Sequence, residues 1–178
     1  IDPAKPMVAL TFDDGPGNYE DRIVAALQKY NSKATFFYVG TQATKFPSTV
    51  KRVADAGNEI GNHSYKHENL PKLSQAAIES SINKTNEILR NQSGQSVSLV
   101  RPPYGATAGS VKPALRATGQ PSILWSIDTL DWKTKNTKNT VNVVLSQVKD
   151  GDIILMHSIY RQTAEAAELI IPALKERG

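Results

Sequence analysis

Short apolar runs alternate with longer amphipathic stretches along nearly the whole chain, and this alternation limits the possible folds more than any other feature. The apolar runs predict strands, and the stretches with apolar residues at helical spacing predict helices. Regular alternation of the two predicts a parallel sheet surrounded by helices, either an open doubly wound sheet or an incomplete (β/α) barrel. The predicted strands cover residues 7–12, 34–39, 59–60, 97–100, 123–127 and 153–156. The predicted helices cover residues 21–30, 48–56, 74–90, 110–118, 140–148 and 163–176.

Three residues bear on where the predicted helices begin, end or bend. Ser74 is a candidate N-cap, because a serine hydroxyl can accept a hydrogen bond from the first helical turn. Gly119 is a candidate C-cap, because glycine adopts the left-handed conformation that ends many helices. Pro172 lies inside the last predicted helix and predicts a kink there. The chain ends on that helix, whereas a closed barrel continues with a strand, so we expect a further strand beyond Gly178.

The chain has 178 residues without a linker, repeat or low-complexity segment, which predicts one domain over residues 1–178. It contains no cysteine, which excludes a disulfide framework, a thiolate metal site and a cysteine nucleophile. No apolar run approaches the ~20 residues of a membrane-spanning helix, so we expect no membrane span. Residues 1–6 do not resemble a signal peptide and are interpreted as a processed or truncated end.

The formal net charge of +4 mildly favours anionic surroundings such as a cell wall, a membrane surface or a nucleic acid. The basic residues are scattered and do not interleave with aromatic ones, so we expect no nucleic-acid partner. Lys133, Lys135 and Lys138 do cluster. They form either a solvated loop or a patch that steers substrate.

Polar clusters directly follow five of the predicted strands. The carboxyl ends of parallel strands share one face of a sheet or barrel, and functional sites assemble on that face. The clusters therefore predict a single site. They are TFDDG (Thr11 to Gly15), HSYKH (His63 to His67), RPPYG (Arg101 to Gly105), DTLDW (Asp128 to Trp132) and His157-Ser158.

The histidines are the most informative residues of these clusters. His63 and His67 are four apart, and a helical turn would place both on one face, close enough to bind one ion. Taken alone, such a pair also arises by chance or on an ordinary surface. Two histidines and one carboxylate, with open positions for water, make a usual hydrolytic zinc site. Either Asp13 or Asp14 can supply that carboxylate.

Asp13 and Asp14 are adjacent acids at a predicted strand end. Two such carboxylates raise one another's pKa unless they have different tasks, such as binding a metal and acting as a base. The structural alternative is a simple turn from Asp13 to Gly17, because Asp, Gly and Pro favour turns. The segment can also be both a turn and a site.

His157 ends an otherwise apolar run, where a histidine is either a core residue or part of a site. Asp131 is a candidate to orient His157 and to stabilise its protonated form, which would make His157 a general acid. The other candidates also have structural alternatives: a surface ion pair for Arg101, packing for Tyr104, and the core for Trp132 and Leu155.

Competing catalytic motifs are absent from the sequence. There is no G-x-S-x-G elbow, no P-loop and no G-x-G-x-x-G segment. Because cysteine is also absent and all three histidines lie in the polar clusters, a metal-dependent hydrolase that activates water is the simplest interpretation.

The segments TFDDG, HSYKH, RPPYG, DTLDW and LMHS resemble, in this order, the motifs of the polysaccharide deacetylase family, which is carbohydrate esterase family four with its NodB-type homology domain. The resemblance spans Thr11 to Ser158 and is specific because five motifs occur in order. It implies an α/β fold, a distorted and incomplete (β/α) barrel. It also implies hydrolytic removal of acetyl groups from glycans.

The resemblance also implies a role for each matching residue. Asp13 is the implied catalytic base, held by Arg101, and Asp131 tunes His157 as the implied general acid. Every motif position is filled, which implies an active enzyme. The implied metal ligands are Asp14, His63 and His67, the implied oxyanion donor is the N–H of Tyr104, and the implied wall of the acetyl-methyl pocket is Trp132 with Leu155.

We therefore expect one divalent metal ion, zinc by default, with cobalt or nickel as substitutes. The expected substrate is an acetylated polysaccharide or oligosaccharide, either peptidoglycan or a chitin-like glycan bearing N-acetylglucosamine. Acetylxylan esterase activity, an O-deacetylation, is the alternative. An inactive glycan-binding module is an alternative of a different class, which the intact Asp13 and His157 argue against. We expect a monomer that is secreted or on the cell surface of a bacterium.

Overall fold

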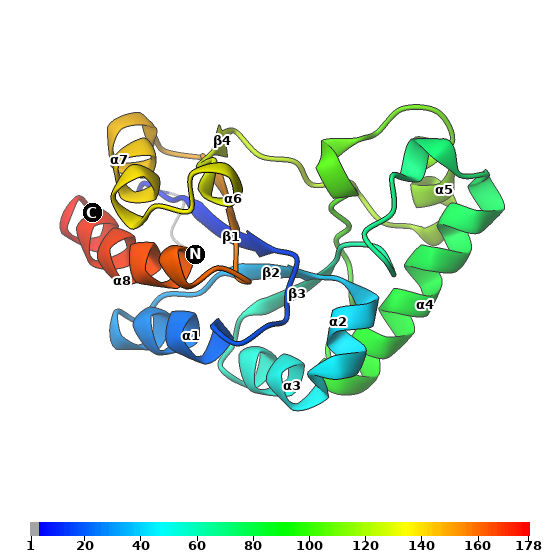
Figure 1. Ribbon diagram of the computed structural model, residues 1–178, viewed down its shortest axis with the longest axis horizontal. Helices are drawn as coiled ribbons and strands as arrows, with labels where there is room; N and C mark the ends of the chain where they lie inside the picture. The colour runs from blue at the N-terminus through cyan, green and yellow to red at the C-terminus, as the bar shows by residue number, and fades with distance from the viewer. Residues whose placement is uncertain (1–3) are drawn as a thin grey trace.

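A curved parallel sheet forms the centre of the computed structural model, which describes residues 4–178 (Figure 1). Its strands lie in the spatial order β3-β2-β1-β5-β4, and every neighbouring pair is parallel. Beyond β3 the pairing continues as two single bridges, from Asn62 to Val100 and from Val100 to Ser122. The strands are β1 (Ala9–Asp13), β2 (Thr35–Tyr38), β3 (Glu59–Asn62), β4 (Ile127–Asp128) and β5 (Ile153–His157).

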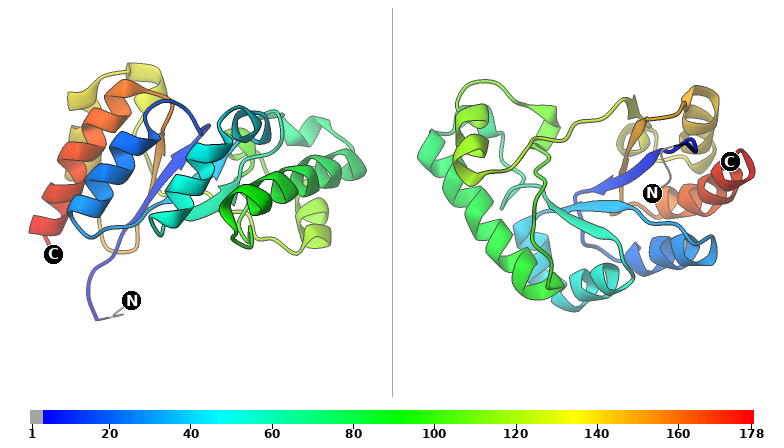
Figure 2. Two further views of the ribbon diagram at one scale, coloured as in Figure 1. Left: turned by 90° about the horizontal axis from the view of Figure 1, so that it is seen from below. Right: turned by 180° about the vertical axis from the view of Figure 1, so that it is seen from behind.

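Helices surround the sheet, with α7 and α8 beside one end of it and α4 and α5 beside the other (Figures 1 and 2). Within residues 4–178, every helix falls short of the length and apolarity that crossing a membrane requires. The α-helices are α1 (Glu20–Lys29), α2 (Gly40–Lys45), α3 (Pro47–Asp55), α4 (Gln75–Ser93), α5 (Val111–Thr118), α6 (Asp131–Thr134), α7 (Thr137–Gln147) and α8 (Arg161–Glu176). Two 3₁₀ turns, η1 (Leu70–Lys72) and η2 (Pro103–Gly105), complete the elements of the described residues.

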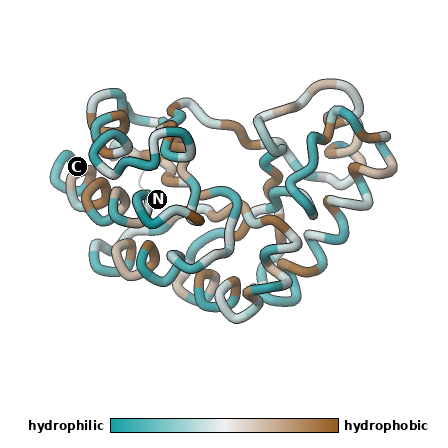
Figure 3. Tube along the Cα trace, in the orientation of Figure 1, coloured by the Kyte–Doolittle hydropathy of each residue, from teal (hydrophilic) through white to brown (hydrophobic). Residues whose placement is uncertain are grey.

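The main core lies between the sheet and the helices packed on it. Phe12 of β1 stacks on Phe36 of β2 with ring centres 5.1 Å apart. Helix α1 turns Ile23 and Leu27, which are four apart, toward this core, and both are fully buried. Apolar and polar residues accordingly alternate along the helices (Figure 3). Burying a side chain such as that of Leu27 stabilises the fold by about 1.5–3 kcal/mol.

A second and smaller core fixes α4 and α5 to the far end of the sheet. Ile78 and Ile82 of α4 pack there with Val111 of α5 and with Val100, which makes the single bridges. This core holds in place a region of the sheet that has few ladder hydrogen bonds of its own.

The predicted helix caps are confirmed. The Ser74 hydroxyl accepts a hydrogen bond from the Ala77 N–H at 3.2 Å, directly before α4. Gly119 follows α5 with a φ of 72°. Pro172 lies inside α8, which continues past it to Glu176 as one helix.

The α/β fold with an incomplete barrel is confirmed, but two of the predicted strands are wrong in extent. Residues 97–100 pair only through the bridges at Val100, and of residues 123–127 only Ile127 belongs to a strand. For residues 123–124 the reason is the buried Arg101 side chain, which donates to their carbonyl oxygens at 3.1 and 2.8 Å. A guanidinium therefore takes the place of a strand ladder. The sequence also does not predict α2, a six-residue helix in which only Gly40 and Ala43 are buried.

Candidate active site

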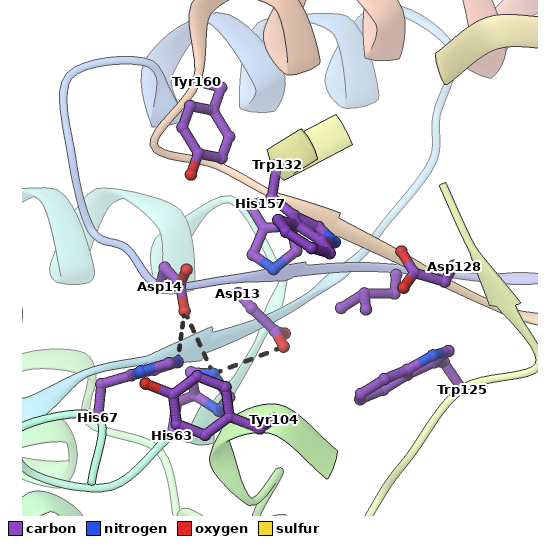
Figure 4. Close-up of a pocket in the computed structure, with 11 residues that line it drawn as sticks. Asp13, Asp14, His63, His67, Tyr104, Trp125, Asp128, Trp132, His157 and Tyr160 are labelled. Carbon is purple, nitrogen blue, oxygen red and sulfur yellow. Dashed lines mark ion pairs between the residues drawn. The ribbon is translucent and has the colours of Figure 1, made fainter. Parts of the chain in front are cut away.

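The polar clusters that follow the strands meet around one pocket of about 380 Å³ at the carboxyl ends of the strands (Figure 4). Among the predicted site residues, only Arg101 and Asp131 do not line it; both are buried and hydrogen-bond to residues that do. The lining residues are Asp13, Asp14, His63, His67, Tyr104, Trp125, Asp128, Trp132, Leu155, His157 and Tyr160.

Asp14, His63 and His67 form a candidate metal centre on one side of the pocket. Oδ1 of Asp14 lies 3.3 Å from Nε2 of His63 and 3.2 Å from Nε2 of His67. Ligand atoms bound tetrahedrally to zinc at their usual bond lengths lie about 3.3 Å apart, so these spacings suit a shared ion. Oδ1 of Asp14 is also buried, and no group in residues 4–178 donates a hydrogen bond to it. The residues present therefore fit a divalent metal ion.

The electrostatics of this side favour a positive charge among the three side chains. Burial alone would raise the pKa of the Asp14 carboxyl, but the imidazoles of His63 and His67 hold it far below its usual range. Burial alone would lower the pKa of His63, but the negative charges of Asp13 and Asp14 raise it above its usual value. These shifts favour positive charge among the three side chains. A divalent cation can supply that charge in place of protons, because metal binding displaces protons from its ligands.

His63 and His67 do not share a helical turn, so that part of the prediction is wrong. They lie in the loop after β3, where Ser64 and His67 have φ values of 66° and 57°. Oδ1 of Asn62 accepts from the Ser64 N–H at 2.8 Å, a local bond that competes with helix formation. Nδ1 of His63 lies 2.6 Å from the carbonyl oxygen of Arg101. This contact makes Nδ1 the donor and leaves the lone pair of Nε2 for the pocket.

Arg101 holds the carboxylate of Asp13 at the end of β1. Nη1 of Arg101 donates to Oδ1 of Asp13 at 2.8 Å and to Oγ1 of Thr11 at 2.7 Å. The guanidinium is fully buried, and it also donates to the carbonyl groups of residues 123–124. Arg101 is thus an interior residue, not a surface ion pair. The second oxygen of Asp13, Oδ2, lies 3.6 Å from Nε2 of His63 and is directed to the pocket.

His157 ends β5 beside Asp13, its register partner on β1. Nδ1 of His157 lies 2.8 Å from Oδ1 of Asp131, and the main-chain N–H of His157 donates to Oδ2 at 2.8 Å. The Thr163 hydroxyl and the Trp132 N–H donate to the same carboxylate. Burial alone would lower the pKa of His157, but Asp131 raises it to about 9, with smaller contributions from the other acids of the pocket. His157 is therefore protonated at neutral pH.

Tyr104 lines the pocket and has a free main-chain N–H. Its φ is 61°, within the turn η2, and within residues 4–178 its N–H has no hydrogen-bond acceptor. Tyr104 is 69% exposed, and its ring centre lies 4.8 Å from that of His67, so the residue belongs to the rim and not to the core. A free N–H beside a candidate metal centre can stabilise negative charge that develops on a bound carbonyl oxygen.

Trp132 and Leu155 form an apolar part of the pocket wall. Leu155 is buried on β5, whereas Trp132 is 46% exposed, so the core alternative is wrong for Trp132. An apolar wall of this kind suits a methyl group better than a hydroxyl or a charge.

Three pocket residues are missing from the sequence-based site: Trp125, Asp128 and Tyr160. Asp128 belongs to the DTLDW segment, and Tyr160 comes three residues after His157, so their position after strand ends was the available signal. Trp125 lies within the wrongly predicted strand 123–127, and its ring is 5.6 Å from the Arg101 guanidinium.

The lysine cluster is exposed: Lys133 lies on α6, Lys135 directly after it, and Lys138 at the start of α7. Nζ of Lys135 is 5.4 Å from the ring centre of Tyr160, which lines the pocket. Lys133, Lys135 and Lys138 form no ion pair within the described residues. The cluster therefore has the place and the uncompensated charge that a steering patch needs, and this role stays a prediction.

Comparison with known proteins identifies the family of this chain. A family model described as polysaccharide deacetylase matches residues 1–123. The chain belongs to the polysaccharide deacetylase family. Its sequence is 40% identical over 179 residues to the peptidoglycan-N-acetylmuramic acid deacetylase PdaC of Bacillus subtilis, a match that covers 100% of this chain and 38% of PdaC. A peptidoglycan-N-acetylglucosamine deacetylase of Bacillus cereus is also 40% identical, with 98% of this chain and 65% of that protein covered.

Solved structures of polysaccharide deacetylase family members have the same fold. The structure of PdaC superposes with a TM-score of 0.94 at 40% identity, covering 100% of this chain and 87% of that one. A Bacillus anthracis protein described as a pseudoenzyme of carbohydrate esterase family four superposes with a TM-score of 0.91 at 35% identity. The match covers 99% of this chain and 63% of that one. The family fold thus occurs both in deacetylases and in a pseudoenzyme. This chain spans less than two thirds of the length of the two curated deacetylases.

Proposed function

We propose that this chain is a metal-dependent hydrolase that removes acetyl groups from a glycan, with residues 1–178 forming one catalytic domain. The observation that carries the proposal is that a cation site, a free carboxylate oxygen of Asp13 and a protonated His157 face the same pocket. These are the parts that hydrolysis of an unactivated acetyl group requires: a Lewis acid, a base for water and an acid for the leaving group.

Asp14, His63 and His67 would hold the metal ion. When bound, a divalent ion supplies a Lewis acid that polarises the acetyl carbonyl and lowers the pKa of water. Zinc suits a carboxylate and two imidazoles, and cobalt or nickel can occupy similar sites.

Asp13 is the proposed base, which accepts a proton from the attacking water. Arg101 holds one oxygen of Asp13 at 2.8 Å and leaves the other for this task. As water attacks, negative charge develops on the acetyl oxygen, and the free N–H of Tyr104 is the proposed main-chain donor to it. Loss of one such donor typically costs about 3–4 kcal/mol of transition-state stabilisation.

His157 is the proposed acid, which donates its Nε2 proton to the leaving nitrogen or oxygen of the sugar. Asp131 orients the ring through Nδ1 and stabilises its positive charge. Trp132 and Leu155 would contact the acetyl methyl group, and the carbonyl would then lie between the metal site and the free N–H of Tyr104.

The proposed substrate is the N-acetylated sugar of peptidoglycan or of a chitin-like glycan. The names of the two curated relatives support peptidoglycan, and their organisms support a bacterial protein. Because peptidoglycan lies outside the cell membrane, the proposed location is the cell surface or the exterior. We further propose that the chain acts as a monomer. Acetylxylan remains the alternative substrate, because an ester can use the same metal site and base.

The test is acetate release from peptidoglycan, chitin oligomers and acetylxylan, with metal content measured on the same sample. The proposal expects metal-dependent release that is fastest on an N-acetylated glycan, and Asp13→Asn serves as the inactive control. Faster release from acetylxylan would favour the esterase. Glycan binding without any acetate release from metal-loaded protein would favour the inactive binding module.

A further inference from the structure

Glu20, in the first turn of α1, is a buried acid that the proposed reaction does not use. Its side chain has 0% exposure. Glutamate is almost never fully buried unless its carboxylate is paired. Here both carboxylate oxygens accept from neutral donors: Oε1 from the Ser158 hydroxyl at 2.6 Å and Oε2 from the Gly17 N–H at 2.8 Å. Burial raises the pKa of Glu20, and these two hydrogen bonds oppose that shift.

The two hydrogen bonds join the segments that carry the two sides of the pocket. Gly17 lies in the turn that follows Asp14, and Ser158 comes directly after His157. The main-chain N–H of Ser158 also donates to the carbonyl oxygen of Asp13 at 3.2 Å. The carboxylate of Glu20 therefore connects the exits of β1 and β5 next to the point where their side chains enter the pocket.

Packing around Gly15 shows how closely this connection supports the turn. A Cβ at Gly15 would lie 2.3 Å from Oε1 of Glu20 and 2.5 Å from Oγ of Ser158. Both distances are too short for any side chain, so the main chain of Gly15 lies directly against the Glu20–Ser158 pair. Gly15 is bonded to Asp14, so the pair borders the turn that carries the candidate metal ligand.

Stabilisation of α1 does not account for this arrangement. An acid in the first turn of a helix is favourable because of the helix dipole, and the bond to Gly17 serves the same helix end. The bond to Ser158 does not stabilise the start of α1 in either way. It joins residues 138 apart in the sequence, and Ser158 directly follows β5. This bond also requires the Ser158 hydroxyl to be fully buried, and burial of a polar group costs free energy.

We infer that Glu20 is a positioning residue that sets the spacing between Asp14 and His157 by tying the turn after β1 to the residue after β5. It touches neither substrate nor metal. The inference rests on the proposed function, in which a metal ligand and a proton donor must act on one acetyl group. A misplacement of about 1 Å between such groups can lower a rate about 100-fold.

The test compares Ser158→Ala with Tyr38→Phe, because each removes one buried oxygen from the same place. The Tyr38 ring packs 3.0 Å from the position of a Gly15 Cβ, and its hydroxyl is buried without a hydrogen-bond partner in the described residues. Ser158→Ala should lower kcat on an N-acetylated chitin oligomer about tenfold, with KM and zinc Kd within about twofold. Tyr38→Phe should leave all three within about twofold.

A second readout separates positioning from a purely structural role. Because Ser158→Ala loosens the segment that carries His157, it should slow an N-acetylated oligomer more than an aryl acetate at equal zinc occupancy. A purely structural role would lower Tm and leave the ratio of the two rates unchanged. Glu20→Gln should stay within about threefold of wild type, because its amide can accept from Gly17 and donate to Ser158, whose hydroxyl is free to reverse.

Two results would overturn the inference. One is Ser158→Ala matching Tyr38→Phe in kcat and in the amide-to-ester ratio. The other is Glu20→Gln losing as much kcat as Ser158→Ala, which would make the charge of Glu20 responsible and not its two hydrogen bonds. Wild-type protein that releases no acetate from any glycan would instead refute the proposed function, so the two failures are distinguishable.

Discussion

The two sides of the pocket are built in opposite ways. On the side of Asp14, His63 and His67, ligand atoms with lone pairs face one another at 3.2–3.3 Å, and no group of residues 4–178 donates to Oδ1 of Asp14. On the side of His157, polar groups are already paired, and the Asp131 carboxylate accepts from a ring, a hydroxyl and two main-chain N–H groups. One side has the donor atoms to bind a cation, and the other favours a proton on His157.

The backbone differs in the same way. Asp14 and His67 have φ values of 72° and 57° and lie in a turn and a loop, whereas His157 ends a regular strand. Left-handed conformations of residues other than glycine persist only where the surroundings impose them. Loss of a group on the metal side should affect every substrate, because every substrate needs the activated water. Loss of a group on the acid side should affect only leaving groups that need a proton.

The largest effect is expected from Asp14→Asn, because it removes the only anionic ligand of the candidate metal centre. One divalent ion per chain should bind to the wild type, and the variant should bind zinc more than about 100-fold more weakly, with no turnover on any substrate. Equilibrium dialysis with elemental analysis measures this. Asp128→Asn, another carboxylate of the pocket, is the matched control and should keep its ion. Full activity after exhaustive chelation would contradict the assignment.

Asp13→Asn should abolish turnover on amides and esters alike and leave zinc affinity within about tenfold. Asparagine has nearly the same shape and can still accept from Arg101, but it cannot take a proton from water. Zinc binding and acetate release should be measured on the same preparation. If Asp13→Asn loses the ion and Asp14→Asn retains it, the roles of the two acids are reversed.

His157→Ala should slow an N-acetylated oligomer by roughly 10²–10⁴-fold, the usual contribution of general acid catalysis, and slow an aryl acetate much less. An expelled amine must be protonated as its bond breaks, whereas an aryl oxide leaves as an anion. The comparison is kcat/KM for both substrates at equal metal occupancy. Equal losses on the two would place His157 with the attacking water or the fold, and would remove the contrast between the two sides.

The sequence predicted the regular part of this molecule better than the irregular part. Strands β1, β2 and β5 follow from their apolar runs, and convergence of the polar clusters follows from their positions at strand ends. The run at 123–127 is misleading, because Arg101 replaces strand hydrogen bonds there with side-chain hydrogen bonds to carbonyl groups. Periodicity cannot reveal a buried arginine of this kind.

The local geometry of the site was also beyond sequence patterns. The spacing of His63 and His67 suits a helix, yet local hydrogen bonds and left-handed residues place both in a loop and still bring them to Asp14. Glu20 carries no signal at all, since an acid at a helix start is usually exposed and capping. The sequence therefore predicted which residues meet, and the structure was needed to see what holds them.

The smallest effect is expected from Asp131→Asn, which keeps the shape beside His157 but removes the charge. The folded pKa of His157, about 9, lies above its usual value, so the protonated form persists at neutral pH and is lost as pH rises through about 9. On amides, kcat/KM should therefore fall as the pH rises through this pKa, which gives the pH profile an alkaline limb. A cation bound at Asp14 offsets the negative charge there, so it can only shift this limb to lower pH. Without Asp131 the pKa returns toward about 6.5, which predicts roughly a 30-fold loss on amides at pH 8 and little loss at pH 6.

The pH profile of an aryl acetate is the control for this prediction, because its leaving group needs no proton from His157. The same Asp131→Asn preparation should show an unchanged aryl acetate rate at pH 8 when metal occupancy is equal. Asp131 also accepts from Thr163, so Thr163→Val serves as a second variant that perturbs the carboxylate without removing its charge. Thr163→Val should leave the alkaline limb near that of the wild type. If it moves the limb as far as Asp131→Asn does, the hydrogen-bond network and not the negative charge keeps His157 protonated.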